Sequence, residues 1–345
     1  MPIKNVGIDL GTANVTVFVE GKGIVLHEKN AAAFDTRTHE LLLVGDEAYA
    51  LLDRAPDTLE LCRPMQNGVI SDFSVMQKIL SLTIETVCGK SVFRPNVVIT
   101  VPDSLTMLEK RTILKVAVQS GAGKVCLLDA TIAAALGAGI GIDEPHGVMM
   151  IDIGAGTADV SLITMGTVAY STALRTAGEA MDEAIQSYLR WERGFLVGLP
   201  TAERIKKILG CAVPRSEEVE LLVNGKNAVT GAPESKTVTS TEICKALREP
   251  VTALTDGILA VLEQTPPELY TDVCSEGITL TGGGSLLHGL ADAIEARLKI
   301  KARTVFDGEH CAAKGAGLAL GSMRTLEDHG YLFRLKSIGQ YETGR

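Results

Sequence analysis

The sequence predicts an α/β protein made of two similar halves, and two observations carry this prediction. The segment IDLGTANVTVF, from Ile8 to Phe18, returns as IDIGAGTADVSLI, from Ile151 to Ile163. Asp9 and Asp152 are 152 − 9 = 143 residues apart, and this period is too long for a solenoid repeat. In both halves, apolar runs of strand type also alternate with helical patterns, as in α/β folds. We therefore expect two duplicated domains that face each other.

In the first half, each copy of the repeat reads as strand, tight turn and strand. Residues 21–34 predict a further strand pair with glycine turns. A helix is expected from about Asp72 to Gly89, followed by a strand that Pro102 closes. An amphipathic helix over 104–122, a strand over 124–130 and a helix of small residues over 131–139 complete this half.

The second half starts near residue 147 and repeats the theme. Helices are expected over 177–194 and 200–210, and the polar stretch 213–238 predicts hairpins of a small subdomain. Thr239 and Glu242 form a capping box, and Pro250 is expected to kink or break the helix that follows. A strand then runs through a glycine turn into a helix, and residues 311–323 form a helix of small residues. We expect domains over 1–140, with an insert at about 33–64, and over 141–325, with an insert at about 180–240, then an extension over 326–345.

Composition limits the class of protein. The 345 residues suffice for two domains, and 46% hydrophobic with 22% charged residues are globular values. A net charge of −9 argues against a nucleic-acid partner, which requires a basic face. Seven cysteines without a C-x-x-C pair indicate reduced thiols of a cytoplasmic protein. The first residues lack the apolar run of a signal peptide, so we expect none, and no apolar run approaches the ~20 residues needed to span a bilayer.

Three glycine-rich turns, each after a predicted strand, carry the expected chemistry. They are Gly11-Thr12-Ala13-Asn14, Gly154-Ala155-Gly156-Thr157 and Gly282-Gly283-Gly284-Ser285. Glycine permits close backbone approach, and successive amides in such turns form an anion-binding nest. Two facing hairpins of this kind suit the phosphates of a nucleotide. Asp9 and Asp152 end strands beside the turns, where a carboxylate suits a hydrated Mg²⁺.

Two other glycine-rich stretches are weaker candidates. Residues 137–141 fall within or after a helix, which makes them a poor dinucleotide fingerprint. The stretch Gly121-Ala122-Gly123-Lys124 continues with Val125, so the Ser or Thr of a P-loop is missing.

An ordered set of motifs over residues 3–320 closely resembles the MreB family of bacterial actin homologues. The set includes GIDLGTAN, TVPDSLTMLEKR, AAALGAGIG, DIGAGTADVSLITMG, AGEAMDEAI, TAERIKKILG and ITLTGGGSLLHGL. The resemblance implies an actin-like ATPase fold with ATP and Mg²⁺ in a cleft between the domains. It also implies self-assembly into filaments at the inner face of the cytoplasmic membrane, where they act with the cell-wall elongation machinery to determine cell shape.

Site residues carry over from the family by position. Asp9 and Asp152 would hold Mg²⁺ through water, and Thr157 would orient the attacking water. The nucleotide-binding set implied by the resemblance is Asp9, Gly11, Thr12, Ala13, Asn14, Asp152, Gly154, Gly156, Thr157, Ala158, Glu203, Arg204, Lys206, Lys207, Gly282, Gly283, Gly284 and Ser285.

The sequence departs from the family at the hydrolytic position. MreB proteins typically have the sequence LIEEPMAAA where this chain has LLDATIAAA. In this alignment, Ala130 takes the position of the Glu that precedes Pro. A methyl group neither accepts a proton nor positions water. Asp129 is adjacent, but a shift of one residue points its side chain elsewhere. We expect a divergent paralogue that is at most a slow ATPase; the alternative is an active ATPase with Asp129 or another carboxylate in the catalytic role. A sugar kinase or heat-shock chaperone of the same superfamily fits the chain length less well.

A membrane contact is expected at Lys90-Ser91-Val92-Phe93-Arg94-Pro95. Val92 and Phe93 form an apolar pair between basic residues in a predicted loop, and in MreB relatives a hydrophobic pair at this place enters the bilayer. The other reading is that both side chains pack into the core as the next strand begins.

Overall fold

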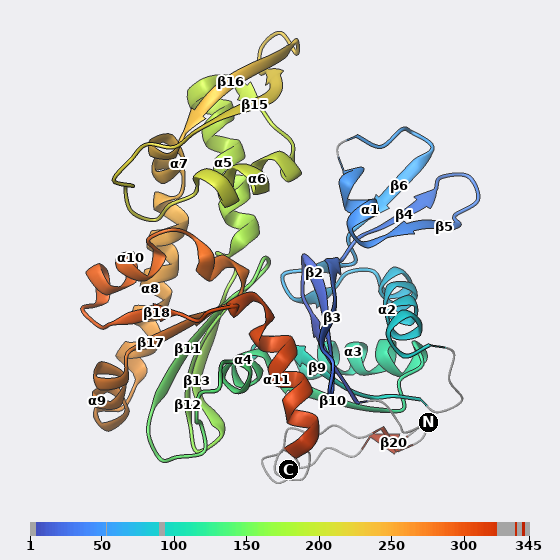
Figure 1. The fold of residues 1–345 in the computed structure, drawn as a ribbon, viewed down its shortest axis with the longest axis vertical. Coiled ribbons are helices and arrows are strands. Elements are labelled where there is room, and N and C mark those ends of the chain that lie inside the picture. Colours follow the sequence, from blue (N-terminus) through green and yellow to red (C-terminus); the bar gives the residue numbers. More distant parts are fainter. Residues whose placement is uncertain (1–4, 53, 90–93, 323–334, 337–339, 342–345) are drawn as a thin grey trace.

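The structure is a computed structural model that describes residues 5–52, 54–89, 94–322, 335–336 and 340–341. Two five-stranded sheets, one in each half, form its centre (Figure 1). The strand order is β10-β9-β1-β2-β3 in the first sheet and β13-β12-β11-β17-β18 in the second. The strands of the first sheet are β1 (Asn5–Leu10), β2 (Asn14–Val19), β3 (Gly23–Lys29), β9 (Asn96–Val101) and β10 (Lys124–Asp129). Those of the second are β11 (Val148–Ile153), β12 (Ala158–Thr164), β13 (Thr167–Leu174), β17 (Ile278–Thr281) and β18 (Ala302–Thr304).

The two sheets repeat one another in register as well as in strand order. Asp9 on β1 lies opposite Thr16 on antiparallel β2 and opposite Thr100 on parallel β9. At the equivalent places, Asp152 on β11 lies opposite Asp159 on β12 and Thr281 on β17. The repeated sequence therefore builds a repeated structure, and a carboxylate replaces a hydroxyl at one of the flanking positions.

Each half carries a small sheet at the upper end of the view in Figure 1. In the first half this sheet has the order β5-β4-β6 and lies beside α1 (Gly45–Ala50); in the second half its order is β14-β15-β16. The strands are β4 (Ala32–Asp35), β5 (Leu41–Val44), β6 (Leu59–Cys62), β14 (Phe195–Leu196), β15 (Glu220–Asn227) and β16 (Pro233–Thr239).

The expected strand pair over 21–34 is wrong, because β3 and β4 belong to different sheets. Buried Asn30 separates them: its amide donates to the Ala13 carbonyl and its side chain to the Gly11 carbonyl. These bonds redirect the chain from the large sheet into the small one.

Helix ends follow the signals in the sequence. Asp72 caps α2 by accepting from the Val75 amide, and Gly89 ends it at φ 72°. Thr239 and Glu242 form the capping box of α7, and the helical pattern breaks at Leu247, three residues before Pro250. The helices are α2 (Phe73–Cys88), α3 (Met107–Gln119), α4 (Ala130–Ala138), α5 (Gly178–Arg193), α6 (Leu199–Leu209), α7 (Ser240–Ala246), α8 (Arg248–Gln264), α9 (Pro267–Glu276), α10 (Leu290–Leu298) and α11 (Cys311–Ala319).

The third glycine turn differs from the expectation, because it first enters the 3-10 helix η1 (Gly283–Leu286) and reaches α10 only afterwards. The remaining short elements are β7 (Met65–Gln66), β8 (Val69–Ile70), η2 (Gly308–His310), η3 (Leu320–Ser322), β19 (Leu335–Lys336) and β20 (Gln340–Tyr341). Within the described ranges, no helix is both long and apolar enough to cross a bilayer.

Helix α11 returns from the end of the second half to pack on α4 and β1 of the first (Figure 1). The helices approach closely because small residues face each other: a Cβ on Gly315 would lie 1.7 Å from the Ala133 carbonyl oxygen. A core that includes Met150 of β11, Cys126 of β10 and Ala316 of α11 joins the halves here. The two sheets thereby become the walls of a cavity.

Candidate functional site

A cavity of about 630 Å³ is lined by residues of both halves. It brings together all three glycine turns and both strand-end aspartates that the sequence singles out. The predicted residues on its wall are Asp9, Gly11, Thr12, Ala13, Asn14, Asp152, Gly154, Gly156, Thr157, Glu203, Lys206, Lys207, Gly282, Gly283 and Gly284.

The two hairpin turns close in the same way. The Gly11 amide donates to the Asn14 carbonyl at 3.0 Å, and the Gly154 amide donates to the Thr157 carbonyl at 2.9 Å. Both turns thus present their backbone to the same cavity from opposite halves, which suits a chain of phosphates held between them.

Gly156 and Gly283 both line the cavity, but their surroundings differ. A Cβ on Gly156 would lie 2.4 Å from Thr12 Oγ1 and 2.9 Å from Asn67 Cα, so this glycine lets the second half approach the first. A Cβ on Gly283 would have no described heavy atom within 4 Å. Gly283 therefore faces open space, as the wall of a ligand site does.

Asp9, near the end of β1, and Asp152, near the end of β11, both line the cavity. Thr100 Oγ1 donates to Asp9 Oδ1 at 2.6 Å, and Thr281 Oγ1 donates to Asp152 Oδ1 at 2.8 Å. Burial raises the pKa of both carboxyls, that of Asp152 to about 7, and the charge of Asp9 adds to this rise. Two half-buried carboxylates, which offer only oxygen atoms as ligands, are the kind of set that suits Mg²⁺.

Two further carboxylates, buried Asp159 and half-buried Asp103, lie near Asp9 and Asp152. Asp159 lines the cavity, and Asp103 lies just beyond the end of β9. Asp103 Oδ2 accepts hydrogen bonds from Ser161 Oγ and from Thr131 Oγ1, the latter at 2.8 Å. Burial, then the charge of Asp129, raises the pKa of Asp103 to about 6.

Side chains on the cavity wall also join the two halves to each other. Lys29 of β3 and Tyr49 of α1 both bind Glu203 of α6, while Arg63 pairs with Glu179 of α5. Burial on its own would raise the pKa of Glu203, but its hydrogen bonds to Lys29, Lys207 and Tyr49 lower it to about 2. Helix α6, which carries four of the nucleotide-binding residues implied by the resemblance, therefore also acts as a clasp between the halves.

The side chain of Lys206 is hydrogen-bonded only to groups of the second half among the described contacts. Its Nζ donates to the Gly178 carbonyl at 2.6 Å and to Asp182 Oδ2 at 2.8 Å. Burial raises the pKa of Asp182 to about 6 even though Lys206 opposes the shift.

Some expected residues lie elsewhere. Arg204 is exposed and off the cavity wall, Ala158 is in the apolar core, and buried Ser285 donates to the Gly282 carbonyl at 2.7 Å. Asp129 also lies off the wall, 3.5 Å from Lys110 Nζ, whereas Ala130 lines it. Val92 and Phe93 are outside the described residues.

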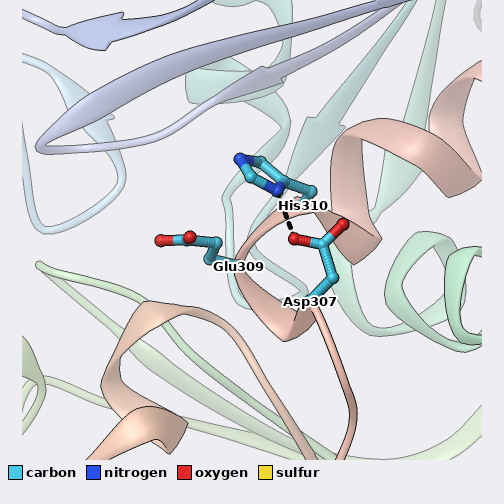
Figure 2. Close-up of side chains that lie close together, drawn as sticks. All are labelled: Asp307, Glu309 and His310. Atoms are coloured by element: carbon cyan, nitrogen blue, oxygen red, sulfur yellow. Dashed lines mark hydrogen bonds and ion pairs between the residues drawn. The ribbon is translucent and has the colours of Figure 1, made fainter. Parts of the chain in front are cut away.

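A group of polar residues at the start of α11 adjoins the cavity. In Figure 2, the Asp307 carboxylate meets the His310 ring, at 2.6 Å from Nδ1, and Glu309 points away from that pair. One donor atom from each of the three lies within 4.8 Å of the others, a set that suits a divalent cation, although two of the three residues are exposed. The ring of His27 stands edge-to-face to that of His310 at 5.0 Å.

Several wall residues were missed by sequence reasoning. They include His27, Lys29, Tyr49, Arg63, Asp159, Glu179, Asp182, Arg215, His288 and Glu309. For Asp159 a signal exists, because it lies in the second copy of the repeat. The other residues reach the cavity wall only through tertiary packing, which no local sequence pattern shows.

Comparison with known proteins agrees with this architecture. The family model described as MreB/Mbl protein matches residues 3–328. The cell shape-determining protein MreB of Escherichia coli is 40% identical over 323 residues, covering 92% of this chain and 93% of its own length. The cell shape-determining protein Mbl of Bacillus cereus is 38% identical over 324 residues, covering 94% and 97%.

Solved structures show the same fold. MreB5 of Spiroplasma citri bound to ADP superimposes with a TM-score of 0.90 at 30% identity, covering 95% of this chain and 99% of that one. The MamK double helical filament gives a TM-score of 0.80 at 22% identity, covering 93% and 99%, a likeness of fold alone. The fold is actin-like, and the chain belongs to the MreB/Mbl family.

Proposed function

We propose that the protein binds ATP with Mg²⁺ in the cavity and assembles into filaments that determine cell shape. One observation carries this proposal: three glycine turns and the two strand-end aspartates, from both halves, line one cavity of about 630 Å³. The Spiroplasma citri relative is solved with ADP and with AMPPNP, which supports a nucleotide as the ligand. Asp9 and Asp152 would hold Mg²⁺, and that cation would offset the charge of the phosphates.

The domain division proposed from the sequence places this nucleotide between residues 1–140 and 141–325. Glu203 of the second domain binds Lys29 and Tyr49 of the first. This contact supports a cleft that closes when the two domains come together. A nucleotide that contacts both walls would fix their relative position and so favour one shape of the subunit for polymerisation.

Self-association is supported by the filament of MamK and by apolar side chains on the surface. Leu222 on β15 is 65% exposed, and Val229 in the turn before β16 is 91% exposed. Isolated apolar side chains are common, but these two share one hairpin at an end of the molecule (Figure 1). Such an end suits contact with the next subunit.

The proposed location is cytoplasmic, at the inner face of the cytoplasmic membrane, with the cell-wall elongation machinery as a partner. The relatives named cell shape-determining proteins support the role. The apolar pair Val92 and Phe93 in the sequence supports the contact with lipid.

We expect hydrolysis to be slow, because Ala130 lines the cavity where the family resemblance implies a glutamate. Introducing Ala130→Glu should raise phosphate release, and general acid–base assistance is worth roughly 10²–10⁴-fold. Wild-type turnover as fast as that of relatives with the glutamate would contradict the expectation. A second candidate function, an active ATPase that uses another carboxylate, is favoured by Asp159 on the same wall.

A further inference from the structure

Two cysteine side chains meet next to the cavity, although they are far apart in the sequence. Cys211 lies two residues after the end of α6 and is fully buried, and its thiol donates to the Ser240 carbonyl at 3.5 Å. Ser240 begins α7, and Cys244 lies four residues further along, on the same side of that helix. A hydrogen bond joins the thiols of Cys211 and Cys244, and neither is in a disulfide. The fold thus builds a pair of adjacent thiols that no C-x-x-C motif marks.

The thiol pair adjoins the cavity through Cys211. Gly210, its neighbour in the chain, lines the cavity, and so does His288, whose backbone forms a bridge with that of Cys211. The Arg215 guanidinium is hydrogen-bonded to the Cys211 thiol and also lines the cavity. Nη2 of Arg215 donates to the Gly210 carbonyl at 3.1 Å. A change at the Cys211 sulfur therefore bears directly on three residues of the cavity wall.

The two thiols differ in their access to solvent. Cys211 is 0% exposed, whereas Cys244 is half-buried. Burial, then the neighbouring Cys244 thiol, raises the pKa of Cys211 to about 11, although Arg215 opposes the rise. Cys211 therefore stays protonated at neutral pH, and an oxidant from solvent reaches Cys244 first. An accessible thiol beside a second thiol is the arrangement of an attacking and a resolving cysteine.

We propose that Cys211 and Cys244 form a redox-sensitive dithiol, which a hydroperoxide converts to a disulfide that weakens nucleotide binding in the cavity. The effect on binding rests on the proposed function, since it requires ATP in the cavity. The Cys244 thiolate attacks one oxygen of the peroxide, the O–O bond breaks, and Cys244 carries a sulfenic acid. The Cys211 sulfur then attacks the Cys244 sulfur, the S–O bond breaks, and the hydroxyl leaves as water with the Cys211 proton. In total, two thiols and one hydrogen peroxide give one disulfide and two molecules of water.

The disulfide is expected to disturb the wall because the surroundings of Cys211 are closely packed. Two sulfurs in a disulfide lie much closer than two hydrogen-bonded thiols, so Cys211 is drawn towards α7. It also loses the proton that it donates to the Ser240 carbonyl. At Gly210, a Cβ would lie 2.3 Å from the Lys206 carbonyl oxygen and 2.8 Å from Leu287 Cδ1. A shift of Cys211 is therefore passed on to the cavity wall rather than absorbed by free space.

Cys274 gives an internal comparison. It is the more exposed thiol, on α9, and its described partner is the hydroxyl of Tyr270 rather than another thiol. Peroxide should therefore leave Cys274 as a sulfenic acid, while it carries Cys244 on to the disulfide.

The test uses the full-length protein, first reduced and then exposed to hydrogen peroxide, with the remaining thiols blocked by N-ethylmaleimide. Mass spectrometry of a digest measures the linked peptides that contain residues 211 and 244, and dithiothreitol should separate them. Calorimetry measures the ATP-Mg affinity of the reduced and the oxidised protein. The variants are Cys244→Ser and Cys211→Ser, with Cys274→Ser as the matched control, and thermal melting checks the fold of each.

We expect the disulfide in wild type and in Cys274→Ser, and none in Cys244→Ser or Cys211→Ser. Oxidation should weaken ATP-Mg binding about fivefold or more in the two proteins that form the disulfide, the lower end of ordinary coupling between sites. Peroxide should leave the affinity of Cys244→Ser unchanged. Because coupling is reciprocal, saturating ATP-Mg should lower the equilibrium constant for disulfide formation in a glutathione buffer by the same factor.

A folded wild type that forms no disulfide between residues 211 and 244 would overturn the proposal. An equal loss of affinity in peroxide-treated Cys244→Ser would overturn it too, because the effect would then arise elsewhere. A disulfide that leaves ATP-Mg affinity unchanged would overturn the regulation and leave the proposed function standing. If the reduced protein bound no ATP, the proposed function itself would fail, and the effect on binding with it, whereas formation of the disulfide would still be measurable.

Discussion

The ammonium nitrogen of Lys29 lies 2.7 Å from Oε1 of Glu203, so a residue of β3 in the first half holds α6 of the second. Tyr49 donates to the other carboxylate oxygen at 2.8 Å. Both charged side chains are about one-sixth exposed, at 15% and 16%. An ion pair this sheltered contributes more than one in open solvent, and it couples closure of the cavity to stability.

Replacing Lys29→Met should lower the free energy of unfolding at pH 7 by about 1.5–3 kcal/mol, the range for hydrogen bonds to charged groups. Because the pKa of Glu203 is lowered to about 2 from 4.5, the stabilisation is present above pH 4.5 and is lost as pH falls towards 2. Denaturant unfolding at pH 7 and pH 3.5 should therefore show a smaller difference between wild type and variant at the lower pH. The exposed Lys22→Met is the control, and a difference that does not depend on pH would contradict the assignment.

Gly283→Val and Gly156→Ala should fail in different ways. The new side chain at position 283 enters open space in the cavity, so we expect at least tenfold weaker ATP binding by calorimetry with an unchanged melting temperature. The new methyl at position 156 meets Thr12 and Asn67, so we expect a lower melting temperature. Wild-type affinity in Gly283→Val would show that this turn does not border the nucleotide.

Lys206→Met should be strongly destabilising, because it leaves Asp182 buried without its cation. Breaking one side of a buried ion pair costs about 3–5 kcal/mol. The cost should fall as pH drops below about 6, since a buried carboxyl with a raised pKa becomes neutral there. Urea unfolding at pH 8 and pH 5 measures both effects, and Lys206→Met with Asp182→Asn should recover part of the stability. Equal destabilisation at both pH values would argue that Lys206 acts by packing alone.

Much of the fold was predictable because its signals are local. The capping box of Thr239 and Glu242, the end of α2 at Gly89 and the repeated hairpins each depend on residues close together in the chain. The break at Leu247 was expected from Pro250. The separation of β3 from β4 was not, because it follows from Asn30 binding the first glycine turn, a contact made only once the sheet is formed.

In the candidate site, too, residues marked by a local motif could be predicted and residues brought together by tertiary contacts could not. The glycine turns and the strand-end aspartates could be predicted from the sequence, because each lies in a motif at the end of a predicted strand. Lys29 and Glu203 are 174 residues apart, and no local pattern marks such a pair. Asp159 could have been predicted from the repeat. It pairs with Asp152 across the second hairpin, just as Thr16 pairs with Asp9 across the first. Ser285 was expected at the ligand, but its hydroxyl closes its own turn.

Membrane attachment is predicted to depend on Val92 and Phe93, which lie outside the described residues. Burying each side chain is worth roughly 1.5–3 kcal/mol, and two adjacent basic residues add about 1 kcal/mol each at an anionic surface. One subunit would bind weakly, and the many copies of a filament would bind firmly. Val92→Ser with Phe93→Ser should abolish sedimentation with anionic liposomes and leave ATP affinity unchanged.

The matched control for this prediction is Met107→Ser with Leu108→Ser, which removes an apolar pair that is 45% and 74% exposed elsewhere on the surface. This control should sediment with lipid as wild type does. Sedimentation of the Val92 and Phe93 double variant at the wild-type level would transfer the anchor to another segment, first to Tyr331, Leu332 and Phe333 of the tail.

A nucleotide held between the two halves is expected to prepare the subunit for assembly. Electron microscopy of the purified protein on lipid, with and without ATP-Mg, tests it most directly. We predict membrane-bound filaments with ATP-Mg, and few or none without nucleotide or in Gly283→Val with ATP-Mg. Equally abundant filaments under all three conditions, or none with saturating ATP-Mg, would contradict the account.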